Sequence, residues 1–383
     1  MGKVSREKIP DYQIYDSARV KVKQMGNITE ITHISHHNEV CPIRNIDADT
    51  YEVRRTGEIR EKKHWENRSQ GQASLLRTFD NLRAVINTNC TQIHKCRWVT
   101  LTYRQNNGDP MTDSKQLYFD VKHFIQRLYR YCEKMNYGRP EYINVCEPQS
   151  TGAWHCHVIL IFPVRAPFIA CSNATYKMLH IERKKNEKTL EEIWGHGFVS
   201  IRSFRTEFGG DVDNVGAYVT AYLADLPLDE ALRCSNLNLS DYIVKESRCY
   251  DDKTQQYVDK RILKGARLHF YPPKFNLYRT SRGIKQPIEY DTNYLTAKKQ
   301  VSGQTLTYSA DYLIKTGATD GAFHFVSSTR HYNAKKLSNQ AVFGGDLIDM
   351  DTGVILESNY SVDLTPIPHR EEKLRKEKGE RQL

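Results

Sequence analysis

Residues 152–162 read GAWHCHVILIF, and this stretch predicts the centre of the fold. From His155 onward it is rich in apolar and β-branched residues, which favours a buried strand. The run YINVC at 142–146 precedes it, and the connection at 147–152 contains a proline and a glycine. Such residues suit a connection between antiparallel strands. The sequence therefore predicts a central β-hairpin with strands at 142–146 and 155–162.

Two helices and a strand are expected before this hairpin. Apolar residues recur at helical spacing from Ser74 to Ile86, and again in a helix that Asp113 caps, with Gln116 at the N3 position, and that runs to about Met135. The run RWVTLTY at 97–103 alternates with period two and ends at the turn-like NNGDP. We expect the longer helix to pack on the sheet.

Three further elements are expected after the hairpin. They are a charged helix from about Thr175 to Trp194, a strand at 197–204, and a short helix at 215–226 that Pro227 closes. The order strand, helix, hairpin, helix, strand, helix predicts the α+β class. A central antiparallel sheet would carry the His-x-His strand, with helices flanking it.

The paired histidines are the first candidate for chemistry. His155 and His157 are separated by one residue, so in a strand both side chains leave the same face and can converge on one ion. Imidazole is a common ligand of divalent metals. The alternative is a pair of half-buried histidines that form hydrogen bonds within the sheet.

Glu147 is the candidate third ligand. It ends the preceding strand, where antiparallel pairing can bring its carboxylate beside the histidines. One hard oxygen with two nitrogens, and open positions for substrate oxygens, suits Mg²⁺ or Mn²⁺ acting on a phosphate. The alternative is a solvated turn carboxylate before Pro148.

Two tyrosines are the candidate nucleophiles. Tyr218 and Tyr222 stand four residues apart in a predicted helix and therefore share one face. A phenol with a pKa of about 10 is a poor nucleophile at neutral pH, and a metal that polarises the phosphate would assist it. The alternative is a pair of core tyrosines in an amphipathic helix.

The segment KRILKGARLHFYPPKFNLYRTSRGIKQP at 260–287 combines many cations with no acid. Aromatic residues lie among the cations, as in a groove that binds phosphates and bases of one DNA strand. The alternative is a solvated basic face with ordinary core aromatics. The cations expected to bind DNA are Lys264, Arg267, Lys274, Arg279, Arg282 and Lys285. The aromatics expected beside them are Phe270, Tyr271, Phe275 and Tyr278.

Composition agrees with a globular nucleic-acid binder. The 383 residues include 56 Lys and Arg against 46 Asp and Glu, a net charge of +10, although solubility alone explains such a charge equally well. A chain of this length is expected to form more than one domain. The nine cysteines are never spaced as Cys-x-x-Cys, which favours reduced thiols over a disulfide framework or a zinc knuckle. No signal peptide or membrane span is expected.

Together these motifs resemble those of the histidine-hydrophobe-histidine (HUH) endonucleases that initiate rolling-circle replication. GAWHCHVILIF looks like their HUH motif, VGAYVTAYLAD at 215–225 is similar to their tyrosine motif, and RWVTLTY resembles their first conserved strand. The histidines precede the tyrosines, as in replication initiators and unlike conjugative relaxases. RTGEIREKKHWENRSQGQASLLRTFDNLRAVINTN and RLHFYPPKFNLYRTSRGIK also look like segments of initiators from plasmids and mobile elements of Gram-positive bacteria. The resemblance covers roughly residues 50–290.

The resemblance implies a metal-dependent enzyme that nicks one strand of origin DNA and later rejoins it. Its tyrosines would form a 5′-phosphotyrosine link and leave a free 3′-OH primer, and its paired histidines, with Glu147, would hold the ion. One departure matters. Ala221 and Asp225 stand where several two-tyrosine relatives carry lysines, so Lys245 or a cation of segment 260–285 is expected to support the phosphate.

On this basis we expect four consecutive segments. They are an N-terminal extension with an amphipathic helix (1–90), an HUH endonuclease domain (91–230), a basic DNA-binding extension (231–300) and a C-terminal segment of unassigned role (301–383). Residues 1–70 are polar and irregular, with one small hairpin turning at 55–58, and a two-stranded element is expected within 344–360, before a charged tail from His369.

The expected partners are origin DNA, single-stranded or extruded as a hairpin, and a host helicase and single-strand-binding protein in the bacterial cytoplasm. A helicase is expected because the sequence has no G-x-x-x-x-G-K-[ST] phosphate loop. The sequence leaves open whether the protein forms a homo-oligomer. The alternatives are a non-catalytic, sequence-specific DNA-binding regulator on the same scaffold, or a single-strand DNA transposase, whose usual brevity and single tyrosine argue against it. His33, His36 and His37 are read as a polar surface cluster in preference to a second metal site.

Overall fold

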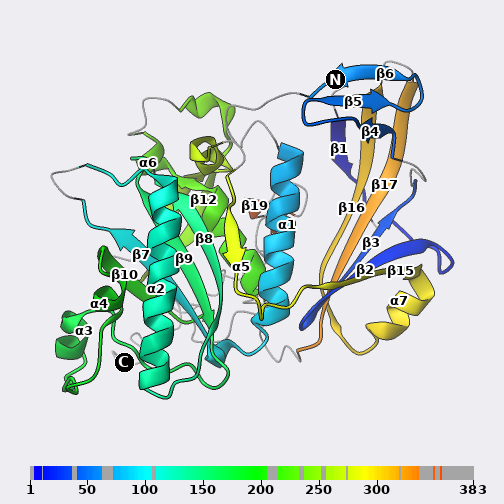
Figure 1. Cartoon of the computed structure of the whole chain (residues 1–383). Coiled ribbons are helices and arrows are strands. Elements are labelled where there is room, and N and C mark those ends of the chain that lie inside the picture. Colours follow the sequence, from blue (N-terminus) through cyan, green and yellow to red (C-terminus); the bar gives the residue numbers. More distant parts are fainter. Residues whose placement is uncertain are drawn as a thin grey trace, which may run out of the picture. The chain divides into compact units, whose positions relative to one another are not determined.

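The computed structural model describes residues 4–10, 12–36, 41–62, 72–105, 109–149, 151–204, 214–232, 237–251, 256–272, 275–318, 321–335, 348–349 and 354–355. The chain forms two compact units, each built from separate stretches of sequence (Figure 1). Unit 1 comprises Met1–Glu66 and Pro287–Leu337, and unit 2 comprises Asn67–Gln286 and Ser338–Leu383. These units do not follow the four expected segments. The amphipathic helix belongs to unit 2, and residues after 301 complete the sheet of unit 1.

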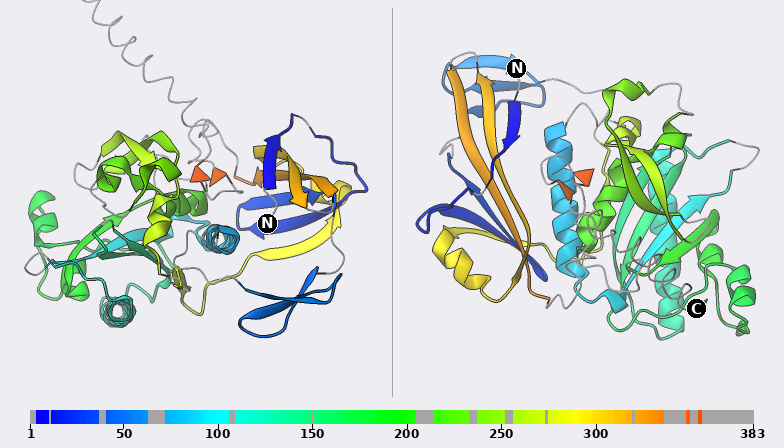
Figure 2. Two further views of the ribbon diagram at one scale, coloured as in Figure 1. Left: turned by 90° about the horizontal axis from the view of Figure 1, so that it is seen from above. Right: turned by 180° about the vertical axis from the view of Figure 1, so that it is seen from behind.

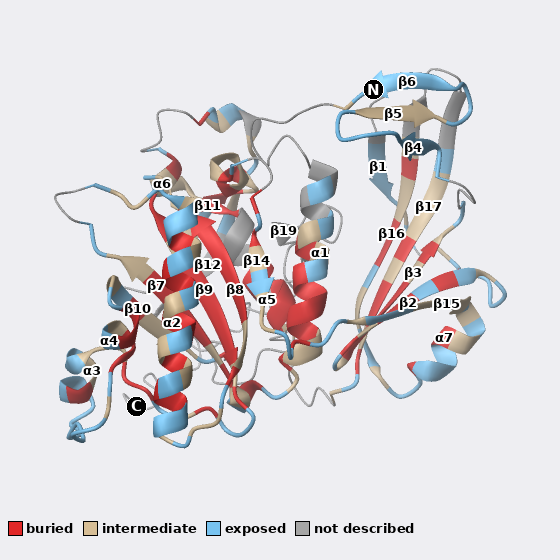
Figure 3. Ribbon diagram, viewed as in Figure 1, coloured by how far each residue is buried: buried red, intermediate tan, exposed pale blue. Residues whose placement is uncertain are grey.

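A five-stranded antiparallel sheet forms the centre of unit 2. Its order is β10 (Gly197–Arg202), β7 (Cys96–Tyr103), β9 (Trp154–Ile161), β8 (Glu141–Pro148) and β14 (Tyr278–Thr280). The predicted hairpin is β8–β9, and the predicted strands at 97–103 and 197–204 are its neighbours β7 and β10. The α+β class is confirmed. Buried residues concentrate in β8 and β9 (Figure 3).

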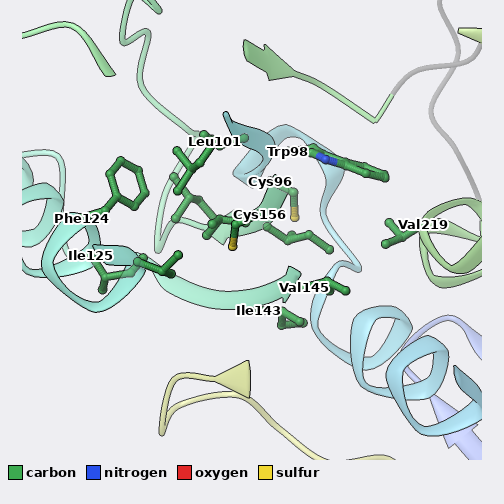
Figure 4. Packing of buried hydrophobic residues seen from close by; sticks show 14 of the residues in the cluster. Cys96, Trp98, Leu101, Phe124, Ile125, Ile143, Val145, Cys156 and Val219 are labelled. Atoms are coloured by element: carbon green, nitrogen blue, oxygen red, sulfur yellow. The ribbon is translucent and has the colours of Figure 1, made fainter. Parts of the chain in front are cut away.

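One face of this sheet packs on α2 (Ser114–Lys134). The predicted cap is confirmed, since the Asp113 carboxylate accepts hydrogen bonds from the backbone N–H groups of Lys115 and Gln116. The apolar stripe of the helix is buried, and in Figure 4 Phe124 lies on the same side of the sheet as Leu101 and Cys156. The hydrophobic face predicted from helical spacing therefore covers the sheet.

The opposite face packs on α1 (Gln72–Asn89) and α5 (Val215–Ala224), as the views in Figures 2 and 4 show. The two helices contact each other closely. Gly216 makes this possible, because a Cβ at that position would lie 2.3 Å from the backbone oxygen of Arg83 on α1. The Asn87 side chain of α1 accepts a hydrogen bond from the Gly216 N–H (2.8 Å) and donates one to Asn214, the N-cap of α5 (2.9 Å).

The single helix predicted for 175–194 is wrong. The structure has two short helices there, α3 (Asn173–Met178) and α4 (Leu190–Trp194). The reason is local, because Thr189 forms a capping box with Glu192 and starts a new helix. The residues between the helices carry charge without an apolar stripe, so nothing holds them as a helix against the sheet.

Smaller elements complete unit 2. A three-stranded sheet has the order β11 (Leu226–Pro227), β13 (Gln256–Leu263) and β12 (Val244–Asp251). The short helices are α6 (Leu228–Ala231) and the 3-10 turns η2 (Ile93–Lys95), η3 (Leu239–Asp241) and η4 (Ala266–Phe270). β18 (Ile348–Asp349) pairs with β19 (Val354–Ile355), which confirms the predicted two-stranded element; the tail from His369 lies outside the described residues.

Unit 1 is built on a six-stranded antiparallel sheet. Its order is β1 (Val4–Lys8), β16 (Thr305–Ala318), β17 (Gly321–Asn333), β3 (Ile28–Ile34), β2 (Arg19–Met25) and β15 (Ile288–Asn293). Helix α7 (Tyr294–Gln300) closes a small core over Val20, Val22 and Ile31. A second, three-stranded sheet contains β4 (Ile43–Asn45), β5 (Thr50–Val53) and β6 (Glu58–Glu61).

The N-terminal expectation is therefore half right. The predicted hairpin at 55–58 is β5–β6, with Gly57 at φ +68° in its turn. The irregular character predicted for residues 1–70 is wrong, because β2 and β3 form a hairpin inside the large sheet. Its strands meet at Gly26-Asn27, a two-residue turn signal that was present in the sequence.

Candidate active site

The register of the central sheet brings the predicted ligands to one face. Glu147 is the direct partner of His155 across β8 and β9, and His157 pairs with Thr100 on β7. Residues directly opposite each other in a ladder point to the same side of the sheet. Glu147 and both histidines therefore lie on the face that α1 and α5 cover.

Glu147 and His157 are in direct contact. Oε2 of Glu147 lies 2.6 Å from Nε2 of His157, and both residues are buried, at 6% and 7% exposed. Nη1 of Arg267 lies 2.5 Å from the other oxygen, Oε1, of the same carboxylate. The alternative of a solvated turn carboxylate is excluded, since Glu147 is enclosed and bonded through both oxygens.

The electrostatics hold Glu147 ionised. Burial raises the pKa of its carboxyl group, but the Arg267 charge, the hydrogen bond from His157 and the charges of His157 and His155 together lower the pKa to about 2. The ionised carboxylate is paired with the Arg267 guanidinium in this buried site.

The second nitrogen of His157 is also bonded. Its Nδ1 accepts a hydrogen bond from the indole N–H of Trp98 (2.9 Å) and lies 3.1 Å from the hydroxyl oxygen of Thr100. Both partners come from β7, and both are buried. They fix the plane of the imidazole, so that Nε2 is directed at Glu147.

The carboxylate of Glu147 and the imidazoles of His155 and His157 are ligands that fit a hard divalent cation. Among the described side chains, Glu147 and His157 are in contact, but the three residues do not form a complete coordination shell. Among the described residues, no group of three His, Cys, Asp or Glu is arranged to hold a metal. His155 stands beside Glu147 in register, with its Nδ1 3.5 Å from the amide nitrogen of Gln149. Binding would require the Glu147–His157 proton to leave, as ligation by imidazole always does.

Helix α5 carries both candidate nucleophiles. Tyr218 and Tyr222 lie within this helix, as predicted, but their side chains are outside the described residues. The helix packs through Val215 and Val219 into the same hydrophobic cluster as Trp98 and Val145 (Figure 4). α5 is thus on the sheet face that bears the Glu147–His157 pair.

Arg267 links the carboxylate to the end of α5. Its Nε donates to the backbone oxygen of Asp225, the C-cap of α5 (3.0 Å), and its Nη1 donates to the backbone oxygen of Pro148 (3.3 Å). It was predicted to bind DNA, yet it is 6% exposed and its donors face protein acceptors. Sequence alone carried no signal for this role.

Residues 96–226 match the family model of Replication-associated protein ORF2/G2P. The match begins with β7 and ends just after α5, so it contains Glu147, both histidines and both tyrosines. It supports a protein of the replication-initiator kind. No curated protein and no solved structure matches the chain. In the described part of the chain, no helix is long and apolar enough to cross a membrane.

The predicted DNA-binding residues all follow the matched region, and those that the structure describes are dispersed. Arg279 lies in β14 on the α2 side of the sheet, with its guanidinium 3.6 Å from the ring centroid of Tyr118. Arg282 and Lys285 are exposed, and Lys264 is half-buried after β13. Lys274 lies outside the described residues.

Two of the predicted base-binding aromatics are core residues. Tyr271 is fully buried, and Phe275 is 6% exposed and stacks on Trp154 with ring centroids 4.7 Å apart. Phe270 and Tyr278 are half-buried. Buried rings cannot stack on bases in this conformation, so segment 260–285 does not present one continuous groove.

The two described histidines of the predicted surface cluster, His33 and His36, differ in their exposure. His33 lies in β3, 8% exposed, with its ring stacked on Tyr12 and its Nδ1 3.0 Å from the backbone oxygen of Arg19. His36 is exposed, and His37 lies outside the described residues. His33 is therefore part of the packing of unit 1, and the prediction of a surface cluster is wrong for it.

Proposed function

We propose that this protein is a metal-dependent endonuclease that nicks one strand of origin DNA by tyrosine attack and starts rolling-circle replication. The observation that carries the proposal is the buried Glu147–His157 pair on the sheet face that α5 covers. The match of residues 96–226 to a replication-associated family supports the same conclusion.

The chemistry is a transesterification. The phenol oxygen of Tyr218 or Tyr222 forms a bond to the scissile phosphorus, and the bond from phosphorus to the 3′ oxygen breaks. The phenol proton passes to solvent or to a nearby base, and the leaving 3′ oxygen takes up a proton. The products are a 5′-phosphotyrosine and a free 3′-OH that a polymerase can extend. In the reverse transfer a 3′-OH forms a bond to the phosphorus of the phosphotyrosine, the bond from phosphorus to the tyrosine oxygen breaks, and the phenol takes up a proton. This rejoins the strand without ATP because the covalent link keeps the phosphodiester energy.

Glu147, His155 and His157 would hold Mn²⁺ or Mg²⁺. When bound, the ion would polarise the scissile phosphate and stabilise charge as the tyrosine attacks. With the metal bound, Thr100 would orient His157 as the acceptor for the Nδ1 proton, and Arg267 holds the Glu147 carboxylate while tying it to the end of α5. These residues would thus hold the proposed metal ligands and the helix that carries the tyrosines in fixed positions relative to each other.

The proposal is tested with Tyr218→Phe and Tyr222→Phe, alone and combined, on a labelled single-stranded or hairpin origin oligonucleotide with Mn²⁺ or Mg²⁺. Removing the phenol oxygen removes the atom that bonds to phosphorus, so we expect the double variant to form no covalent adduct. Adduct formation by the double variant would show that another residue attacks.

A second measurement concerns the metal. His157→Ala should abolish nicking while DNA binding in EDTA is largely kept, because the ligand is lost but the basic surface is not. Wild-type protein that binds origin DNA specifically but never nicks it with any divalent metal would favour the regulator. Cutting at the ends of a mobile element would favour the transposase. Origin DNA, a host helicase and a single-strand-binding protein are the proposed partners, in the bacterial cytoplasm.

A further inference from the structure

A cavity lies at the edge of the unit 2 sheet, where β7 begins and β10 ends. Its volume is about 470 Å³, and the loop that follows β9 forms one wall. Arg97, Arg165 and Arg202 line it together with His94, and none of the described residues lining it is an Asp or a Glu. Because guanidinium groups stay protonated in proteins, the cavity attracts anions at any physiological pH.

The cations of the cavity are partly preorganised. The Arg97 guanidinium donates to the backbone oxygens of Cys96 (2.8 Å) and Ala166 (3.2 Å). Carbonyl groups orient a guanidinium without neutralising its charge. Ala166 belongs to the loop that also carries Arg165, so these bonds hold the loop against the start of β7.

The remaining wall is apolar and contains an accessible aromatic ring. Phe168 is 55% exposed, and Pro167 and Ile201 lie beside it in the lining. Exposed aromatic rings next to cations are the usual arrangement for a nucleotide, since the phosphate is attracted to the charge and the base stacks on the ring. The cavity is also of the size that small ligands occupy.

The sheet register places one lining residue of this cavity, Arg202, on the face of the candidate active site, whereas Arg97 and Ile201 leave the opposite face. Arg202 on β10 pairs with Trp98 on β7, whose indole donates to His157. Arg202 and His157 thus lie on the same face, separated by two strand spacings across the sheet and by two residues along the strand. The usual strand spacings give about 12 Å between their Cα atoms. A few nucleotides of one DNA strand cover that distance.

We propose that the cavity binds one nucleotide unit of single-stranded DNA, with its phosphate on the arginines and its base against Phe168. In this role it holds the strand a few nucleotides from the bond that is cut. The proposal rests on the proposed function for the identity of the strand, but its test measures binding and not cleavage.

The experiment is fluorescence anisotropy with a short labelled single-stranded oligonucleotide in EDTA, using the full chain. Arg165→Ala should weaken binding about five- to tenfold and lower the slope of log affinity against log salt by about 0.7, the value for one phosphate contact on a single strand. Phe168→Ala should weaken binding about tenfold and leave that slope unchanged, because stacking releases no counterion. Both side chains reach the surface, so the variants should fold.

Matched controls come from α2. Phe119 is 57% exposed and Arg130 is exposed, and neither lines the cavity. Phe119→Ala and Arg130→Ala should bind the oligonucleotide like the wild type. Equal binding by all four variants and the wild type, or no detectable oligonucleotide binding by the wild type, would overturn the proposal.

Calorimetric titrations with dTMP and with inorganic phosphate distinguish binding of a DNA strand from binding of a free anion. If Arg165→Ala weakens the binding of dTMP or inorganic phosphate but leaves oligonucleotide affinity unchanged, the cavity binds a free anion and the proposal is wrong. If both cavity variants lose oligonucleotide affinity as described but the wild type forms no covalent adduct with Mn²⁺, the cavity assignment stands and the nicking function fails.

Discussion

At the scale of single residues, His157 has two competing partners for its Nδ1. In the hydrogen-bonded arrangement of the structure, the Trp98 N–H donates to Nδ1, and Nε2 then carries the proton that faces Glu147. Ligation of a metal by Nε2 requires the other tautomer, in which Nδ1 is the donor. The Thr100 hydroxyl, 3.1 Å away, is the acceptor for that proton. At the proposed metal site Thr100 would therefore be a positioning residue, a role for which the sequence gave no separate signal.

Thr100→Val tests this role, because valine keeps the shape of threonine and removes the acceptor. We expect the affinity for Mn²⁺, measured by calorimetry, to fall about 10- to 100-fold, as is usual when a bonded partner of a metal ligand is lost. Ser200→Ala is the control, since Ser200 pairs with Thr100 on β10. Mn²⁺ affinity equal to that of the wild type in Thr100→Val would remove Thr100 from the site.

Asp225 gives a pH-dependent stability. It is 7% exposed, its Oδ2 has no hydrogen-bond partner among the described residues, and its Oδ1 accepts from the Gly265 N–H (2.9 Å). Burial raises the pKa of Asp225 to about 6, against the opposing effects of that hydrogen bond and of the nearby charges of Lys264, Arg267 and Lys245. The contribution of Asp225 to the free energy of unfolding is most favourable at low pH, where its carboxyl group is protonated. That contribution is lost as pH rises from about 4 through 6.

Asp225→Asn should remove this loss while its side-chain oxygen keeps the bond to Gly265. We expect the variant to gain roughly 1–3 kcal/mol of unfolding free energy over the wild type at pH 7, and little at pH 4. Urea denaturation can be followed by tryptophan fluorescence, to which Trp98, Trp154 and Trp194 of unit 2 contribute. A constant difference between the two proteins across this pH range would contradict the assignment.

At the scale of elements, the placement of α5 depends on its contact with α1. Gly216 lets the helices approach until backbone meets backbone, and Asn87 and Asn214 bond across the junction. Arg267 holds the other end of the helix at Asp225. Helix α5, which carries both candidate tyrosines, is therefore positioned by partners that lie outside the motif at 215–225, on α1 and η4.

Gly216→Ala distinguishes packing from helix propensity. Propensity alone predicts a gain of about 1 kcal/mol, since alanine favours a helix interior. The close approach to the Arg83 oxygen predicts instead a loss of roughly 1–3 kcal/mol. The sign of the change in unfolding free energy decides between them. Adduct yield should also fall more than Mn²⁺ affinity, because α5 moves while the sheet-borne ligands stay.

At the scale of the whole molecule, unit 1 forms only when distant parts of the chain meet. β17 pairs with β3, which joins Asn333 to Ile28, and β15 pairs with β2. The residues of α7 and the turn after it, Ala297 and Val301, complete the core over Val22 and Ile31. The β2–β3 hairpin is thus stabilised by residues that follow unit 2 in the sequence.

A chain that ends at Gln286 should lose this order. An isolated hairpin is marginally stable in water, so we expect the backbone amides of β2 and β3 to lose protection from hydrogen exchange and proteases to cut there. The full chain is the reference for both measurements. Unchanged protection of β2 and β3 in the shortened chain would show that the hairpin folds without its partners.

Local pattern was sufficient for much of unit 2. The β8–β9 hairpin, the Asp113 cap of α2 and the helix at Val215–Ala224 depend on neighbours a few residues away, and all were predicted. The β2–β3 hairpin also had a local signal at Gly26-Asn27 and could have been found. The helix predicted through 179–189 failed because charge alone does not hold a helix to a sheet.

By itself the sequence determined which residues could do chemistry, because alternation in a strand puts His155 and His157 on one face whatever surrounds them. Only the tertiary structure decided their partners. Burial of Arg267 against Glu147, the contact of Trp98 and Thr100 with His157, and the arginine cavity beside β10 depend on strand register and on loops distant in sequence. Such contacts arise from the folded packing of many elements, and no local pattern of residues encodes them.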